Sequence, residues 1–163
     1  MGPHEFANLV DEHGAALILY ARQWCDAPED VVQDAFLKLV VQHERPRDVV
    51  PWLYRVVRNG ALDSGKTARR RERRERIAAR PERWFIEPAV EGLDADVAVE
   101  ALQQLPLDQR EAIVARLWGG LSFEEIAAVA ECSASTAFRR FSAGIDALRE
   151  ILGAVCTNRS SKT

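Results

Sequence analysis

Apolar side chains recur about every three or four residues through most of the chain, which is the spacing of amphipathic α-helices. In the first half of the sequence this spacing predicts three helices. The first spans about Phe6 to Tyr20, the second starts at Pro28 with Asp26 as its cap, and the third carries Pro51 in its first turn. No strand-like alternation of apolar and polar residues accompanies them. The first half is therefore predicted to be a small bundle of helices.

The second half continues the helical spacing in four segments. They are expected at about residues 96–105, 108–118, 123–130 and 134–152. Ser122 and Glu125 have the spacing of a capping box, in which each side chain binds the backbone N–H of the other residue. Ser133 follows a tight turn and is placed to cap the last helix. A short helix, a turn and a longer helix together form a helix-turn-helix pattern.

Composition and charge divide the chain into two domains. The 163 residues are 47% apolar and 29% charged, which is typical of globular proteins. The net charge of -3 hides a basic block at 66–80, with 8 Lys/Arg and 2 Asp/Glu, beside an acidic stretch at 81–100. The fold class is predicted to be all-α, with two small helical domains joined by an acidic linker and the helix-turn-helix in the second domain. We place the domains at 1–80 and 96–163 and the linker at 81–95.

Patterns of catalytic and metal-binding residues are absent from the sequence. The cysteines Cys25, Cys132 and Cys156 form no CxxC pair, and the histidines are scattered. No phosphate-binding or nucleophile motif occurs, so we expect no cofactor, no metal and no enzymatic activity. The longest uncharged apolar run is too short to span a bilayer, and no signal-like N-terminus is visible. We therefore expect a cytoplasmic protein without membrane insertion.

Two segments carry side chains that suit nucleic acid. The last predicted helix begins with Ser, Thr and Arg side chains, which can bind phosphates and base edges in a major groove. The segment Trp52–Asn59 mixes aromatic, Arg and amide groups next to the basic block, which suits unstacked bases. Each segment also has a plainer interpretation. Arg139 and Arg140 fit a solvated helix face, Trp52 and Tyr54 fit a core, and the basic block fits a solvated helix end.

Two ordered groups of motifs resemble those of the bacterial RNA polymerase sigma factors. The first group, similar to their first conserved domain, contains PEDVVQDAFL at 28–37, PWLYRVVRN at 51–59 and three arginines at 69–71. The second group, similar to their last domain, contains LQQLP at 102–106 and LSFEEIA at 121–127. The middle domain of larger sigma factors is missing. The chain therefore resembles the extracytoplasmic-function (ECF) group of the sigma-70 family.

This resemblance implies three sets of contact residues. Docking on core RNA polymerase is implied for Asp30, Gln33, Asp34 and Phe36. Reading and melting of the -10 promoter element is implied for Trp52, Arg55, Arg58, Asn59, Asp63, Lys66, Arg69, Arg70 and Arg71. Reading of the -35 element is implied for Ser133, Ser135, Thr136, Arg139 and Arg140. The resemblance also implies core RNA polymerase, promoter DNA and an anti-sigma factor as partners.

The second domain departs from the family pattern at several positions. Glu131 stands in the turn where the family usually has Gly, and a left-handed backbone there would cost a residue with a side chain about 1–2 kcal/mol. Phe138, Ala143 and Ile145 occupy positions that are often basic, so the recognition helix is less cationic than is usual. Either contact with the -35 element is weak, or Phe138 and Ile145 pack on a partner protein.

The sequence is therefore interpreted as a sigma factor that binds core RNA polymerase and directs promoter-specific transcription initiation. The alternative is a sigma-like helix-turn-helix DNA-binding regulator that does not itself initiate transcription, and the less cationic recognition helix motivates it. A helical hydrolase or metal enzyme is disfavoured, because no set of ligands or nucleophile is visible.

Overall fold

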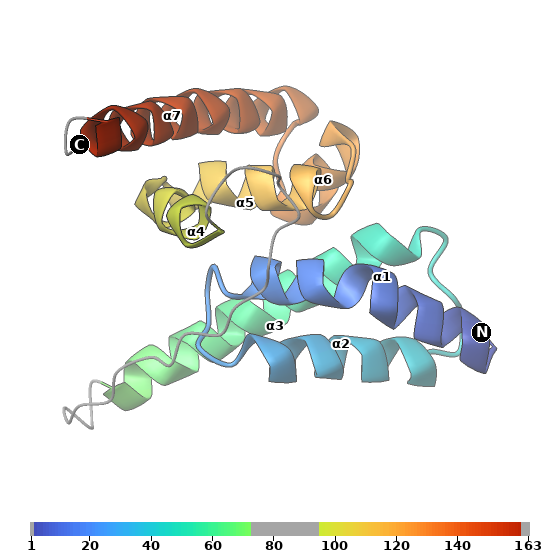
Figure 1. Cartoon of the computed structure of the whole chain (residues 1–163). Helices are drawn as coiled ribbons and strands as arrows, with labels where there is room; N and C mark the ends of the chain where they lie inside the picture. The colour runs from blue at the N-terminus through green and yellow to red at the C-terminus, as the bar shows by residue number, and fades with distance from the viewer. Residues whose placement is uncertain (1, 73–94, 161–163) are drawn as a thin grey trace.

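The computed structural model describes residues 2–72 and 95–160, with side chains for 2–67 and 98–153, and this part of the chain contains helices and no strand. The helices are α1 (Pro3–Ala21), α2 (Pro28–Val41), α3 (Val49–Glu72), α4 (Ala95–Gln104), α5 (Leu107–Leu117), α6 (Phe123–Ala130) and α7 (Ala134–Ser160). They form two layers in Figure 1, with α1 to α3 in the first and α4 to α7 in the second. The predicted all-α fold is confirmed.

The first layer is a unit of three helices, each of which contacts the other two. Its centre contains Leu17 of α1, Leu39 of α2 and Leu53 of α3, all buried. Gly65 of α3 lies against the turn after α1, where a Cβ atom would come within 2.3 Å of the Trp24 carbonyl oxygen. Only glycine permits this close approach. The contact explains a residue that is otherwise unfavourable inside a helix.

The second layer packs α7 against α4, α5 and α6. This layer has a separate apolar cluster on the side that faces α7, formed by Leu102, Leu105 and Ile113. At the start of α6 the backbone N–H of Glu125 donates to Ser122 Oγ at 3.2 Å, and that of Ser122 donates to Glu125 Oε2 at 2.7 Å. The predicted capping box is confirmed, and it begins α6 at the expected residue.

The two layers also pack on each other, because α1 contacts α5 and α3 contacts α6. One continuous cluster of buried side chains includes Leu17 and Tyr54 from the first layer and Val114 and Ile126 from the second. The prediction of two domains joined by a linker did not include such a shared interface. Residues 81–94 of the predicted linker lie outside the described residues.

Two helix ends differ from their predicted form. Asp26 does not cap α2, because the N-cap residue is Ala27 and no side chain bonds there. Pro28 occupies the first turn, and its fixed φ angle and missing N–H suit a helix start that has no side-chain cap. The last helix continues to Ser160 and does not end near Leu152.

Glu131 follows α6 in the left-handed conformation, with φ 54° and ψ 48°. It is the only non-glycine residue with positive φ in the described part of the chain. Its backbone continues directly into the turn that leads to α7. The turn therefore has the left-handed backbone whose cost was considered from the sequence. Glu131 adopts it although its Cβ atom makes this conformation unfavourable.

We predict that Glu131→Gly raises the free energy of unfolding by about 1 kcal/mol, because it removes the steric cost of the left-handed backbone. Urea unfolding followed by circular dichroism measures the change. Glu131→Ala is the control, since it removes the carboxylate and keeps the Cβ atom. An equal gain in both variants would contradict the prediction and point to the charge instead of the backbone.

Candidate nucleic-acid interface

The exposed face of α2 carries the polar residues predicted to dock on a protein partner. Asp30, Gln33 and Asp34 are all exposed, and their spacing places them side by side on the helix. Asp30 lies in the first turn, where the positive end of the helix dipole favours a carboxylate. The row continues into Leu37 and Val41, which are 56% and 74% exposed. The face is thus acidic at its start and apolar at its end.

Phe36 does not belong to this exposed face, contrary to the prediction. Its side chain is buried, and its ring packs edge-on against Phe6 with 5.8 Å between the ring centroids. Helical spacing turns position 36 to the same side as the buried residues Val32 and Leu39. Phe36 is therefore a core residue that holds α2 against α1.

α3 carries an exposed row of polar residues, Arg55, Asn59, Asp63 and Lys66. Neighbours in this row are three or four residues apart, so they share one side of the helix. Lys66 Nζ lies 3.7 Å from Asp63 Oδ1 in an exposed pair, which contributes little to stability and leaves both groups open to a ligand. Trp52 lies at the start of the same helix and is half-buried against the core. The row offers cationic, amide and carboxylate groups beside an aromatic ring.

Arg69, Arg70 and Arg71 lie in the last turns of α3. Their side chains lie outside the described residues. The helix that carries the exposed row therefore continues into the basic block, and the role of these arginines in phosphate binding stays a prediction.

Arg58 is turned away from the row and towards the second layer. Its Nε donates to Glu111 Oε1 at 2.7 Å, and its guanidinium carbon lies 5.9 Å from the centroid of the Trp24 ring. Burial disfavours the charge of Arg58, but the hydrogen bond and negative charge of Glu111 outweigh burial and raise the pKa of Arg58. The side chain is only 19% exposed. Arg58 is thus a cation that already has an anion bound.

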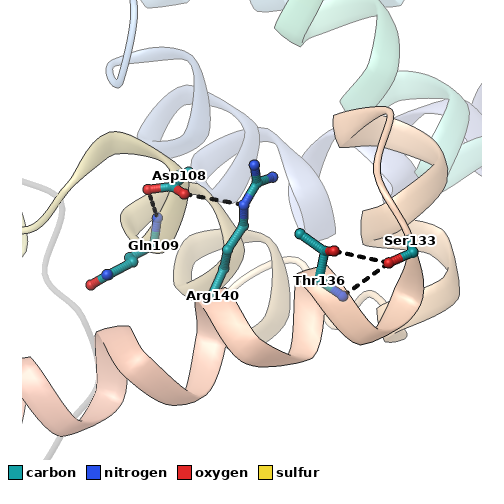
Figure 2. Close-up of polar contacts among 5 residues, drawn as sticks. All are labelled: Asp108, Gln109, Ser133, Thr136 and Arg140. Atoms are coloured by element: carbon teal, nitrogen blue, oxygen red, sulfur yellow. Dashed lines mark hydrogen bonds and ion pairs between the residues drawn. The ribbon is translucent and has the colours of Figure 1, made fainter.

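Ser133 caps the start of α7, the second helix of the helix-turn-helix, as Figure 2 shows. Its Oγ accepts the backbone N–H of Thr136 at 3.2 Å and lies 2.9 Å from Thr136 Oγ1 and 3.0 Å from Ser135 Oγ. The predicted cap is confirmed. The three hydroxyl groups gather at the positive end of a helix dipole, where phosphate oxygens are favoured.

The two neighbouring arginines of α7 have different surroundings. Arg139 is exposed. Arg140 is half-buried, and its Nε lies 3.1 Å from Asp108 Oδ2 (Figure 2). The other oxygen of Asp108 accepts the backbone N–H of Gln109, which fixes the carboxylate at the start of α5. Arg140 therefore braces α7 against α5, whereas Arg139 faces solvent.

Phe138 and Ile145, two apolar residues of α7 at positions that are often basic, also have different surroundings. Phe138 is 55% exposed and meets the ring of Phe123 edge-on at 5.3 Å. Ile145 packs against the apolar cluster of the second layer. Ile145 is thus explained by packing inside the chain, and only Phe138 remains a candidate for contact with a partner.

Glu111 is the residue that sequence reasoning missed. It is buried on α5, and its Oε1 accepts hydrogen bonds from the Tyr20 hydroxyl at 2.8 Å and from Arg58 Nε at 2.7 Å. Burial and the adjacent carboxylate raise the pKa of Tyr20 well above its usual value, so its hydroxyl keeps the proton that it donates. The signal in the sequence was a charged residue directly before the apolar run 112–115, because a buried charge needs a partner.

The described residues contain no group of three or more His, Cys, Asp or Glu side chains that could hold a metal ion. Within that same part of the chain, no helix combines the length and the apolar character that crossing a membrane requires.

Models of known families match both layers. Sigma-70 region 2 matches residues 9–75, which include most of α1 and all of α2 and α3. Sigma-70 region 4 matches residues 96–148, which run from α4 into α7. The two matched ranges contain both groups of motifs on which the resemblance was based.

Several sequence relatives are sigma factors. The RNA polymerase sigma factor CarQ of Myxococcus xanthus is 34% identical over 133 residues, which cover 77% of this chain and 74% of CarQ. The ECF RNA polymerase sigma factor SigL of Mycobacterium tuberculosis is 32% identical over 151 residues, which cover 86% of this chain and 85% of SigL.

Two solved structures share the fold of most of the chain. The sigma factor RpoE in complex with the anti-sigma factor NepR, from Bartonella quintana, matches with a TM-score of 0.75 at 26% identity, over 91% of this chain and 97% of that one. CnrH in complex with the cytosolic domain of CnrY matches with a TM-score of 0.61 at 25% identity, over 94% and 90% of the two chains. The chain therefore belongs to the sigma-70 family and is an ECF sigma factor, which directs RNA polymerase to promoters for transcription initiation.

Proposed function

We propose that this sigma factor divides polymerase docking and promoter recognition among three helices. Residues 1–80 form the domain that binds core polymerase through α2 and the -10 element through α3. Residues 96–163 form the domain that reads the -35 element through α7, and 81–95 link the two. The exposed polar row on α3 supports this assignment most directly, because a continuous row of such groups next to a basic block suits a nucleic-acid strand.

α2 is proposed to dock on core polymerase through Asp30, Gln33 and Asp34. A carboxylate-bearing face attracts a basic partner surface and orients its approach. Leu37 and Val41 lie exposed further along the same helix and supply apolar area that loses water on docking. The buried residue Phe36 supports this surface from behind by fixing α2 on α1.

α3 is proposed to hold the melted -10 strand. Arg55, Arg58 and Lys66, with Arg69 to Arg71, hold phosphates, while Asn59 and Asp63 offer donors and acceptors to base edges. Trp52 adds an aromatic plane. Extruding a base costs a few kcal/mol, and stacking on an aromatic side chain returns about 1–3 kcal/mol per base. A single helix that carries both kinds of contact meets the energetic requirement of melting.

α7 is proposed to read the -35 element with its first turns. The cluster of Ser133, Ser135 and Thr136 suits phosphate oxygens and base edges, and Arg139 supplies a free fork of donors for phosphate or guanine. Arg140 contributes mainly by holding the helix at the correct angle on α5. A recognition helix with few cationic residues can therefore still bind DNA, because the hydroxyl groups and Arg139 make the contacts.

We further propose that an anti-sigma factor binds this chain, that the protein acts in the cytoplasm and that it has no enzymatic activity itself. RpoE was solved with the anti-sigma factor NepR, and CnrH with the cytosolic domain of CnrY. The fold match over most of the chain supports a partner of the same kind.

The function is tested by adding the purified chain to core RNA polymerase and mapping transcript starts on genomic DNA. Transcripts that share -35 and -10 elements are the expected result. Binding to DNA without core polymerase and without transcripts would favour the alternative, a DNA-binding regulator that does not initiate transcription.

We predict that Asp30→Arg combined with Gln33→Ala weakens binding to core polymerase by about tenfold or more, because it reverses a charge at the centre of the acidic face. Fluorescence anisotropy of the labelled chain titrated with core measures the affinity. Asp11→Arg, an exposed charge reversal on α1, is the matched control. Unchanged affinity of the double variant, with the control also unchanged, would remove α2 from the docking surface.

We predict that Arg139→Ala lowers promoter use by about tenfold, the effect of losing one good base or phosphate contact. Arg140→Ala should act less on DNA affinity and more on the stability of the second domain, because Arg140 is paired with Asp108. Transcription from the mapped promoter and thermal unfolding measure the two effects. Arg149→Ala, further along α7, is the control, and equal effects of all three variants would contradict the assignment.

A further inference from the structure

Glu111 joins the two layers through a buried polar contact. Its carboxylate comes from α5, and the two groups that donate to it, Tyr20 and Arg58, come from α1 and α3. The side chain of Glu111 is only 6% exposed, so both donors meet it away from water. Around it, the rings of Trp24 and Tyr54 pack edge-on against the ring of Tyr20 at 4.9 Å and 4.8 Å. The proposed promoter contacts leave this network unexplained.

We propose that Glu111 is an autoinhibitory latch, whose carboxylate occupies Arg58 in place of a DNA phosphate and holds the free sigma factor closed. The proposal rests on the proposed role of Arg58 as a phosphate ligand in the -10 region. It adds a residue of the -35 domain that regulates the -10 domain from within the same chain.

Competition for Arg58 is the physical basis of the latch. A carboxylate and a phosphate are alternative acceptors for the same guanidinium group. Glu111 takes the Nε donor, and the remaining exposure of 19% leaves little room for a DNA strand. The negative charge of Glu131, at the end of α6, also acts on Arg58. DNA therefore reaches Arg58 only when α5 and α6 move away from α3.

The polar part of the closed interface adds little stability. The Tyr54 hydroxyl is buried and has no hydrogen-bond partner among the described residues. It lies against Gly119, where a Cβ atom would come within 2.6 Å of its oxygen. An unsatisfied buried hydroxyl is unfavourable, and a buried ion pair gains little over its hydrated, separated ions. Separation still exposes the apolar side chains that the layers share, so a ligand must bind one side tightly to drive it.

The docking face of α2 remains accessible while the latch is closed. α2 packs on α1 and α3, and its residues Asp30, Gln33 and Asp34 are exposed in the closed arrangement. Core polymerase can therefore bind α2 first, and promoter DNA can then displace Glu111 from Arg58. This order would keep the free chain from occupying DNA before it has bound polymerase.

The test measures DNA affinity of the full-length free chain without core polymerase. The probe is premelted DNA that carries the promoter found by transcript mapping, and anisotropy reports binding. Glu111→Gln removes the charge, leaves Arg58 buried without an anion, and should bind at least about tenfold more tightly. Tyr20→Phe removes one hydrogen bond and should gain less. Glu150→Gln, an exposed carboxylate on α7, should change affinity by less than about twofold.

Small-angle scattering and circular dichroism accompany each variant. The latch requires that Glu111→Gln keeps its helical signal and gains radius of gyration. A folded Glu111→Gln variant that stays as compact as the unmodified chain, or that opens without binding DNA more tightly, would overturn the proposal. If Glu111→Gln loses its fold, Tyr20→Phe carries the same test with the same two outcomes.

Arg58→Ala in the Glu111→Gln background separates the latch from the proposed role of Arg58. Loss of the gain in affinity supports the exchange of carboxylate for phosphate. A gain that persists without Arg58 would overturn that exchange and the assignment of Arg58 to DNA. Transcript mapping with the unmodified chain tests the sigma function independently of both results.

Discussion

A buried carboxylate must find hydrogen-bond donors, and Glu111 finds both of its donors across the interface between the two layers. This constraint fixes α5 against α1 and α3 and brings Tyr54 onto Gly119. It also removes Arg58 from the exposed row of α3. The relative placement of the two sigma regions thus rests on a shared apolar cluster with a polar contact inside it, and that contact adds little stability because both charges lose water on burial.

The other functional surfaces are arranged around this contact. The acidic face of α2 and the first turns of α7 point to solvent, so the proposed polymerase docking and the proposed -35 reading need no change inside their own layers. The proposed -10 contacts differ, because Glu111 holds Arg58 in the closed arrangement and the proposed latch releases it only when the layers separate. The proposed latch therefore ties the opening of the duplex to a change in the protein that ligands can drive.

Local features were predictable from the sequence and long-range ones were not. Helical spacing, the Ser122–Glu125 capping box and the Ser133 cap depend on residues within a few positions of each other, and the structure confirms them. Phe36 was assigned to the docking face by the family resemblance alone, whereas helical spacing turns it to the buried side of α2, where the structure places it. Arg58 and its partner Glu111 are 53 residues apart, and no periodic pattern relates two such positions. Even so, the charged residue in an apolar segment of α5 marked the place where a partner was required.

The most direct test of this account is the distance between the two layers before and after polymerase and promoter bind. A fluorescent donor on α2 and an acceptor on α7 report that distance by energy transfer in single molecules. We expect high transfer in the free chain and a marked fall in the promoter-bound holoenzyme. Equal transfer in the two states, or low transfer in the free chain, would contradict it.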